Sequence, residues 1–210
     1  MNPEILESEI ISYSNAGEGA TNKKLSDLIY NTVGGSAYKA YKAIDEASKA
    51  NENTHIKDFS TTLMIAICKK FDFGWFIASF WVGDGAMCIY DRDRQYIKLL
   101  GIPDGGEFAG QTRFITMKEI FTPESIMSRL RFSIEKDFTA LLLMTDGISD
   151  PYFETDSNLN KIEKWNELWD AITKEVQLTD DNSESQYQLL KWMDFWSPGN
   201  HDDRTLAILY

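Results

Sequence analysis

The sequence of 210 residues contains only two cysteines and two histidines, and it contains no long apolar run. Two cysteines at unrelated positions make neither a disulfide framework nor a zinc-ligand pattern. Two histidines are too few for a histidine-rich metal site. No apolar run approaches the length of a membrane span, so we expect no membrane association. Met1–Tyr13 also lacks the basic start and apolar middle of a secretory signal, which predicts a protein of the reducing cytoplasm.

A basic surface is missing as well, because 33 acidic residues outweigh 21 basic residues and the net charge is −12. Nucleic-acid binding needs a basic patch to neutralise phosphates, so we expect no nucleic-acid partner. The hydrophobic fraction of 43% and the six tryptophans exclude a disordered chain. The length suits one domain with a sizeable core, and no linker-like tract divides it, so the sequence predicts a single domain over residues 1–210.

The first half of the sequence predicts a helix followed by several strands. Ile10–Ser14 suggests a short strand that leads into a glycine-containing turn and then a helix with its apolar stripe between Leu25 and Ala47. Aromatic and β-branched residues indicate four further strands that we expect to form a β-meander. These four strands are Phe59–Cys68, Phe73–Val82, Gly85–Tyr90 and Gln95–Leu100.

The second half predicts an alternation of strands and helices. Thr122–Leu130 suggests a short helix with Thr122 as its N-cap and proline at the first helical position. The tryptophans of Asn160–Val176 recur at helical spacing, which is typical of core packing rather than of a ligand cage. Another helix is expected after Ser183, with Tyr187, Leu190, Trp192, Met193 and Trp196 on its apolar flank, and strands are expected at Thr112–Thr116, Ala140–Thr145 and Thr205–Tyr210. Together these patterns predict an α+β fold in which helices cover sheets.

Aspartates stand where predicted strands begin or end. Asp146 follows the apolar run Leu141–Met144 and precedes a glycine, while Asp84 and Asp202 lie next to other predicted strands. A buried carboxylate needs a partner, because isolated buried charge is costly. One interpretation is an Asx-type turn in which Asp146 accepts backbone N–H groups. The other is that several strand ends gather carboxylates around a hard divalent cation.

Four stretches resemble, in their order and spacing, the motifs of the metal-dependent protein phosphatases of the PPM type, the protein phosphatase 2C-like family. Ser60–Leu63 is similar to the family's Gly-Thr-Thr strand, and Val82–Gly85 resembles its Val-Gly-Asp-Ser turn. Thr145–Asp150 resembles its Ser-Asp-Gly-(apolar)-x-Asp turn, and Asp202–Leu206 resembles its closing Asp-Asn/Asp-x-(Ser/Thr)-apolar motif. The resemblance covers roughly Phe59–Tyr210.

The resemblance implies an αββα sandwich of two antiparallel sheets flanked by helices, with a two-metal Mn²⁺ or Mg²⁺ site. It implies that Asp146 and Asp202 are ligands of the paired metals. It also implies that Asp84 and Asp150, together with Asp146, hold a third and weaker metal. For Asp84 and Asp150 the alternative interpretation is turn capping.

The N-terminal part departs from the family pattern. The family has an Asp-Gly-x-Gly turn after an early strand, which supplies a bridging carboxylate and a glycine carbonyl. The matching place here is Ala16–Gly19, so Gly17 would supply the carbonyl while Ala16 replaces the aspartate. An inactive natural variant, an engineered substitution, a truncated chain, or a ligand set in which Glu18 or Glu9 substitutes would each give this pattern.

The resemblance implies a phosphoserine/phosphothreonine phosphatase that uses two-metal, activated-water hydrolysis of phosphomonoesters, with a phosphoprotein substrate or a regulatory protein as partner. The alternatives are an inactive phosphatase-like module that binds a protein partner, and an unrelated acidic metal-binding domain. A cysteine nucleophile is not expected, because Cys68 is followed by two lysines and Cys88 lies mid-strand. The glycine-rich Gly101–Gly110 lacks the Gly-Lys-Ser/Thr ending of a nucleotide-binding loop. His201, next to Asp202, is a candidate contact to phosphate or solvent.

Overall fold

The computed structural model describes residues 3–16, 22–104, 112–179, 184–195 and 202–210. Contacts divide the chain into two compact units. The first unit comprises Met1–Gly83 and Asp104–Asp137, and the second comprises Asp84–Pro103 and Phe138–Tyr210. Among the described residues, no helix combines the length and the apolar character that crossing a membrane requires.

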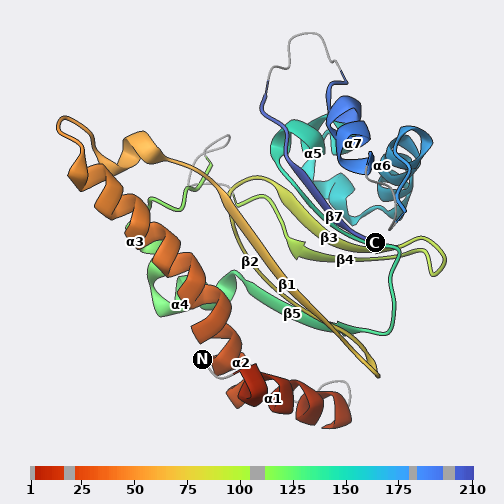
Figure 1. Cartoon of the computed structure of the whole chain (residues 1–210), viewed down its shortest axis with the longest axis horizontal. Helices are drawn as coiled ribbons and strands as arrows, with labels where there is room; N and C mark the ends of the chain where they lie inside the picture. Colours follow the sequence, from red (N-terminus) through yellow and green to blue (C-terminus); the bar gives the residue numbers. More distant parts are fainter. Residues whose placement is uncertain (1–2, 17–21, 105–111, 180–183, 196–201) are drawn as a thin grey trace. The chain divides into compact units, whose positions relative to one another are not determined.

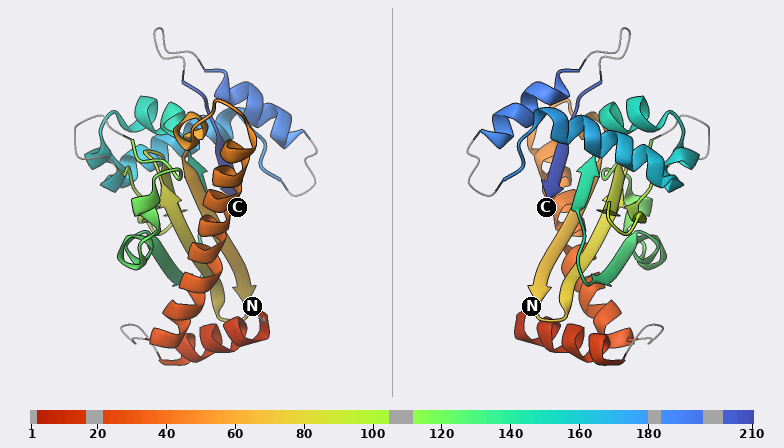
Figure 2. Two further views of the ribbon diagram at one scale, coloured as in Figure 1. Left: turned by 90° about the vertical axis from the view of Figure 1, so that its left-hand side faces the viewer. Right: turned by 90° about the vertical axis from the view of Figure 1, so that its right-hand side faces the viewer.

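The first unit packs helices against a three-stranded antiparallel sheet of order β1-β2-β5 (Figure 1). Its strands are β1 (Leu63–Phe71), β2 (Gly74–Val82) and β5 (Leu130–Glu135). Its helices are α1 (Pro3–Ala16), α2 (Lys23–Ile29), the π-helical η1 (Tyr30–Gly34), α3 (Gly35–Ala50), α4 (Pro123–Ser128) and the 3-10 helices η2 (Ile56–Phe59) and η3 (Lys118–Phe121). Figure 2 shows that α2, η1 and α3 follow one another without a break.

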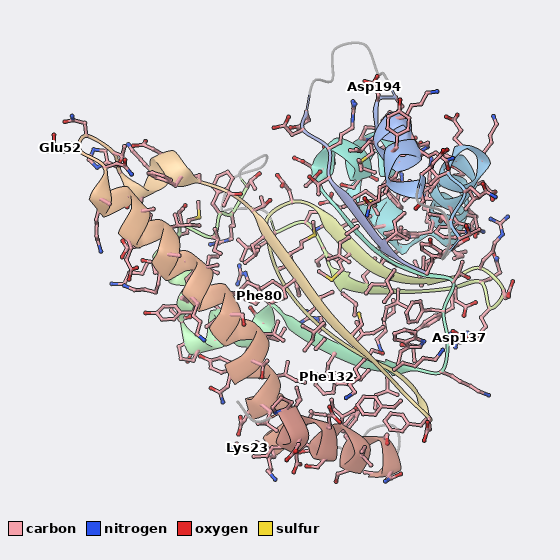
Figure 3. The ribbon with its side chains drawn as sticks, viewed as in Figure 1. Lys23, Glu52, Phe80, Phe132, Asp137 and Asp194 are labelled. Carbon is pink, nitrogen blue, oxygen red and sulfur yellow. The ribbon has the colours of Figure 1, made fainter. Side chains whose placement is uncertain are left out.

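The core of the first unit follows from the period-2 pattern of β2. Phe76, Ala78, Phe80 and Val82 are buried alternate residues of this strand that form one cluster with helix residues such as Ile10 and Ile29. Phe80 of β2 and Phe132 of β5 are labelled in Figure 3. The helices of this unit therefore cover the sheet face that carries these alternate residues.

The second unit packs helices against a four-stranded antiparallel sheet of order β4-β3-β6-β7. Its strands are β3 (Ala86–Asp91), β4 (Tyr96–Gly101), β6 (Ala140–Met144) and β7 (Leu206–Leu209). Its helices are α5 (Asp146–Phe153), the 3-10 helix η4 (Asp156–Asn160), α6 (Ile162–Glu175) and α7 (Ser185–Met193), of which α5, α6 and α7 lie together on the sheet in Figure 1. Trp165, Leu168 and Ile172 of α6 are fully buried in one cluster with alternate residues of β3 and β6. The prediction that the tryptophan stripe is core packing is therefore confirmed.

The α+β fold class, with two antiparallel sheets flanked by helices, is confirmed. The helix predicted over Thr122–Leu130 is present as α4 but ends at Ser128, and Leu130 belongs to β5 instead. Its N-cap Thr122 accepts a hydrogen bond at Oγ1 from the Ser125 N–H at 3.2 Å. The single domain over residues 1–210 stays a prediction.

The strand predicted at Ile10–Ser14 is wrong, because these residues belong to α1. Leu6, Ile10 and Tyr13 follow the helical spacing i, i+4, i+7, and all three pack on the core of the first unit. The helical spacing becomes visible only when Leu6, which lies outside Ile10–Ser14, is included. The first described segment, Pro3–Ala16, is therefore helical rather than extended.

The predicted β-meander is also wrong. The pairs β1–β2 and β3–β4 form as expected, but they belong to different sheets. The chain leaves the first sheet at Gly83, whose φ of +120° suits glycine, and a Cβ there would collide with the Thr62 side chain. Pairing partners depend on this backbone conformation, which the alternation of apolar residues does not encode.

Two smaller predictions need correction, and a third lies partly outside the described residues. Thr112–Thr116 forms only an isolated bridge at Thr112, whereas Leu130–Glu135, which carries the alternation Leu130, Phe132, Ile134, pairs with β2 as β5. In α7, Trp192 is buried, but Tyr187 and Leu190 are 70% and 64% exposed, so the expected apolar flank is narrower. The predicted cap Ser183 and the flank residue Trp196 lie outside the described residues.

Candidate functional site

Asp146 lies at the junction between a buried strand and a helix. Strand β6 ends at Met144, Thr145 is the N-cap residue, and α5 begins at Asp146. A carboxylate in the first helical turn is stabilised by the N-terminal end of the helix dipole. The Gly147 N–H donates to Asp146 Oδ1 at 2.9 Å, so part of the Asx-type interpretation is present. Gly147 itself is a helical residue rather than part of an open turn.

The segment that carries Asp202 is held beside this junction by hydrogen bonds around Thr145. The Thr145 N–H donates to the Thr205 carbonyl at 3.1 Å, and the Thr205 N–H donates to Thr145 Oγ1 at 3.0 Å. Thr145 Oγ1 also donates to the Asp203 carbonyl at 3.3 Å. These bonds continue the β6–β7 pairing, in which Met144 faces Leu206. The segment Asp202–Thr205 is therefore fastened to the start of α5.

Sheet register brings Asp84 to the same place. Ala86 of β3 pairs with Met144 of β6 in an antiparallel ladder, and Asp84 lies two residues before Ala86, just as Asp146 lies two residues after Met144. Asp150 follows Asp146 by four residues in α5, so the two side chains share one face of the helix. All four predicted acids thus belong to the second unit.

The charges of these acids act on one another. Burial, and then the negative charges of Asp84 and Asp202, raise the pKa of Asp146. Burial also raises the pKa of Asp150, followed by the negative charges of Asp84, Asp156 and Asp202. We call Asp84, Asp146, Asp150 and Asp202 the acidic cluster. The negative charge of these neighbouring carboxylates is of the kind that a bound divalent cation would neutralise.

The donor chemistry fits Mn²⁺ or Mg²⁺, because carboxylate oxygens are the ligands that hard cations prefer. Within the parts of the chain that the structure describes, however, no three His, Cys, Asp or Glu side chains come close enough to hold a metal ion as they stand. The acids therefore carry the oxygen ligands that such an ion prefers and influence one another electrostatically, but the described residues do not form a complete coordination site.

The N-terminal elements of the predicted site are not in the context that the resemblance implies. Gly17, Glu18 and the candidate His201 lie outside the described residues. Ala16 is the last residue of α1, so a helix stands where the family's early strand was expected. The substitute ligand Glu9 lies in α1 and accepts a hydrogen bond from Lys24. The match of Ala16–Gly19 to the family's Asp-Gly-x-Gly turn required a preceding strand, and the structure has a helix there instead.

Two residues near the acidic cluster were missed by sequence reasoning. Asp156 begins η4, where an acidic residue looks like an ordinary first-turn residue. Arg204 lies inside the motif Asp202–Leu206 at a position that the motif leaves variable. Arg204 Nε donates to the Gly147 carbonyl at 3.3 Å, and this contact joins the two acid-bearing segments. Only the folded structure shows it.

Cys88 does not have the surroundings of a cysteine nucleophile. Arg94 stands six residues after Cys88, which is the spacing of cysteine phosphatases, but Cys88 is fully buried in β3 and burial raises the pKa of its thiol strongly. Arg94 is paired with Asp91 at 2.6 Å. Cys88 is thus a small buried core residue, as the sequence predicts.

Comparison of the sequence and the structure with known proteins identifies the family of this chain. The sequence profile of the family described as Protein phosphatase 2C matches residues 6–194. No curated protein matches the chain. Among solved structures, the chain is similar to a bacterial serine phosphatase at 14% identity and a TM-score of 0.47, covering 98% of this chain and 75% of that one. It is also similar to the phosphatase domain of the cell fate determinant SpoIIE from Bacillus subtilis, at 15% identity and a TM-score of 0.37, covering 92% of this chain and 75% of that one. Since the profile spans most of the 210 residues, the chain belongs to the protein phosphatase 2C family.

Proposed function

We propose that this chain is a metal-dependent phosphatase that hydrolyses phosphoserine and phosphothreonine in a phosphoprotein substrate. The observation that carries the proposal is the acidic cluster, in which burial, and then neighbouring carboxylates that include Asp84 and Asp202, raise the pKa values of Asp146 and Asp150. Membership of the protein phosphatase 2C family supports the reaction class. Two free cysteines fit the proposed cytoplasmic location, where thiols stay reduced.

In this proposal Asp146 and Asp202 hold the paired Mn²⁺ or Mg²⁺ ions, and Asp84 and Asp150 hold a weaker third ion together with Asp146. The Gly17 carbonyl remains a further proposed ligand. Bound ions of this kind supply an activated water near neutral pH and neutralise charge on the phosphoryl group.

The chain's own residues prepare the site in two ways. At the start of α5 the Gly147 N–H fixes the orientation of the Asp146 carboxylate and offsets part of the rise in its pKa. The two hydrogen bonds between Thr145 and Thr205, one of them accepted by the Thr145 hydroxyl, hold together the segments that carry Asp146 and Asp202. Rigid placement of this kind reduces the reorganisation that ligand binding and catalysis require.

A second candidate function is an inactive phosphatase-like module that binds a regulatory protein or a phosphoprotein. The observation in its favour is that α1 is a helix that ends at Ala16, so the described residues show no early strand followed by an aspartate, which the resemblance implies. If the module is inactive for this reason alone, the acidic cluster would still bind Mn²⁺ while turnover is missing.

The experiment that separates the two functions measures hydrolysis of p-nitrophenyl phosphate and of a phosphothreonine peptide by the purified chain with millimolar Mn²⁺ or Mg²⁺. We expect metal-dependent turnover that Asp146→Asn abolishes. Asparagine keeps the size of the side chain and the acceptor for the Gly147 N–H, so the fold should persist. Turnover that survives Asp146→Asn would refute the proposed mechanism.

Ala16→Asp serves as a parallel variant in the same assay. Activity that appears only in this variant would assign the natural chain to the binding module. If both proteins turn over equally, position 16 lies outside the site, which agrees with the helical context of Ala16. If both are inactive but bind Mn²⁺, the binding module is again favoured.

A further inference from the structure

The Arg204 side chain reaches two elements of the second unit at once. Its Nε donates to the Gly147 carbonyl in α5 at 3.3 Å, and its Nη1 donates to the Met193 carbonyl, in the last residue of α7, at 3.0 Å. The guanidinium carbon lies 4.5 Å from the centroid of the Phe195 ring. Asp194, labelled in Figure 3, marks the end of α7 between these two contacts. One side chain thus fastens the start of α5 to the end of α7.

Gly147 transmits the position of Arg204 to the acidic cluster. Its carbonyl accepts from Arg204, and its N–H donates to Asp146 Oδ1 at 2.9 Å. The contact is also tight, because a Cβ added at Gly147 would lie 3.1 Å from Arg204 Cγ and closer than 3.0 Å to the Asp203 carbonyl oxygen. The stem of Arg204 therefore packs directly on the residue that orients the Asp146 carboxylate. We therefore expect a displacement of Arg204 to change the orientation of this carboxylate and the path of the segment that carries Asp202.

Arginine suits this place better than lysine does. Two donors in a rigid planar fork reach carbonyls on separate helices, and the flat face covers an aromatic ring. Lysine would offer one flexible ammonium group to the same two carbonyls.

The aromatic side chains around the guanidinium reinforce the same connection. Phe195 contacts Tyr152 of α5 edge-to-face, with ring centroids 5.5 Å apart, and contacts Trp192 of α7 at 5.4 Å. Tyr152 and Trp192 also stack on each other at 5.8 Å. The Arg204 guanidinium therefore packs on an aromatic cluster that already joins α5 to α7.

We propose that Arg204 is a positioning residue that fixes the segment carrying Asp202 against the start of α5, where Asp146 lies, and thereby supports divalent metal binding. The metal part of this inference rests on the proposed function, whereas the connection between α5, α7 and the segment Asp202–Thr205 does not. The two parts can therefore be tested separately.

The first measurement is Mn²⁺ affinity, followed by the electron paramagnetic resonance signal of free Mn²⁺ at a temperature where every variant is folded. Arg204→Met keeps the apolar stem and removes the guanidinium, and we expect it to weaken Mn²⁺ binding about 10–100-fold, as losses of outer partners of metal ligands do. Arg204→Lys should recover part of this loss. A purely structural role would lower the melting temperature but leave the affinity of the folded protein unchanged, and that result would overturn the proposal.

The matched control is Arg92→Met. Arg92 belongs to the same unit and forms an ion pair with Asp170 on the surface, and both side chains are exposed. This control should leave Mn²⁺ affinity unchanged. An equal loss of affinity in Arg92→Met and Arg204→Met would mean that a general change of charge, rather than positioning, is responsible, and would also overturn the proposal.

The second measurement needs no metal and follows amide hydrogen exchange in the metal-free protein. Arg204→Met should accelerate exchange at Gly147, Thr145 and Thr205 about tenfold or more relative to wild type, while Arg92→Met should not. If wild type binds no Mn²⁺, the proposed function fails, and this exchange experiment still decides whether Arg204 positions the acid-bearing segments. Unchanged exchange at all three amides refutes the positioning role. If Arg204→Met does not fold, Arg204→Gln, which keeps a polar end on a similar stem, replaces it in both measurements.

Discussion

Replacement of Gly147 by alanine tests how closely the two acid-bearing segments approach each other. A Cβ at this position would lie below 3.0 Å from the Asp203 carbonyl oxygen, whereas ordinary contacts begin at 3.4 Å. The obstacle is backbone rather than the flexible end of a side chain, so Gly147→Ala forces the segment Asp202–Thr205 to move away from α5. That movement opens the hydrogen bonds between Thr145 and Thr205.

Two opposing effects set the stability of Gly147→Ala. Overpacking of a close contact costs about 1–3 kcal/mol. Alanine in place of glycine in a helix gains at most about 1 kcal/mol. The overlap is severe, so the cost should prevail and the free energy of unfolding should fall by about 1–2 kcal/mol. For a protein of this size each kcal/mol changes the melting temperature by roughly 2–4 °C, so melting should occur roughly 2–8 °C lower.

Gly35→Ala is the matched control in the first unit. A Cβ at Gly35, the first residue of α3, meets nothing within 4 Å. The same chemical change should therefore stabilise the protein by about 0.4–1 kcal/mol, chiefly through the unfolded chain. The two substitutions thus differ in sign for a reason that only their surroundings supply.

The assays are urea unfolding of the metal-free proteins and Mn²⁺ titration at a temperature where both variants are folded. Gly147→Ala should also weaken Mn²⁺ binding by about tenfold or more, because the spacing of Asp146 and Asp202 changes. Gly35→Ala should bind Mn²⁺ like wild type. If Gly147→Ala is as stable as Gly35→Ala and binds Mn²⁺ equally well, the inferred tight contact between Gly147 and Asp203 is wrong.

Two further predictions concern the charges of the acidic cluster. Burial, and then Asp84 and Asp202, raise the pKa of Asp146, so the folded chain keeps a proton that the unfolded chain releases above its ordinary pKa of about 3.9. The free energy of unfolding should therefore fall as pH rises from that value through the raised pKa of Asp146. Metal-free Asp146→Asn should be more stable than wild type in urea at pH 7, and the difference should disappear below about pH 3.9. Lower stability of the variant at pH 7 would contradict this account. Mn²⁺ at 100 times its dissociation constant should stabilise the folded protein by about 2.7 kcal/mol and raise the melting temperature by roughly 5–10 °C, reversibly with a chelator, whereas a flat response to millimolar Mn²⁺ and Mg²⁺ would count against any divalent site.

Local sequence patterns determined most elements of this protein. The helical spacing of Trp165, Leu168 and Ile172 predicts α6, and Thr122 followed by proline predicts the start of α4. These signals succeed because the period of apolar residues and the chemistry of helix caps act over a few neighbouring positions. The placement of aspartates at strand ends is equally local, which is why Asp84, Asp146 and Asp202 could be predicted from the residues, whereas Asp150 was predicted from the resemblance to a family motif.

Only the tertiary structure decided which of these local pieces meet. The apolar residues around Ile10 serve a helix because they pack on the core of the first unit, and β2 and β3 separate into different sheets at Gly83. Arg204 carries no recognisable signal in the sequence, because its carbonyl acceptors on Gly147 and Met193 lie 57 and 11 residues away along the chain. Contacts of this kind depend on burial and on the register of distant strands, so they exist only after the chain has folded.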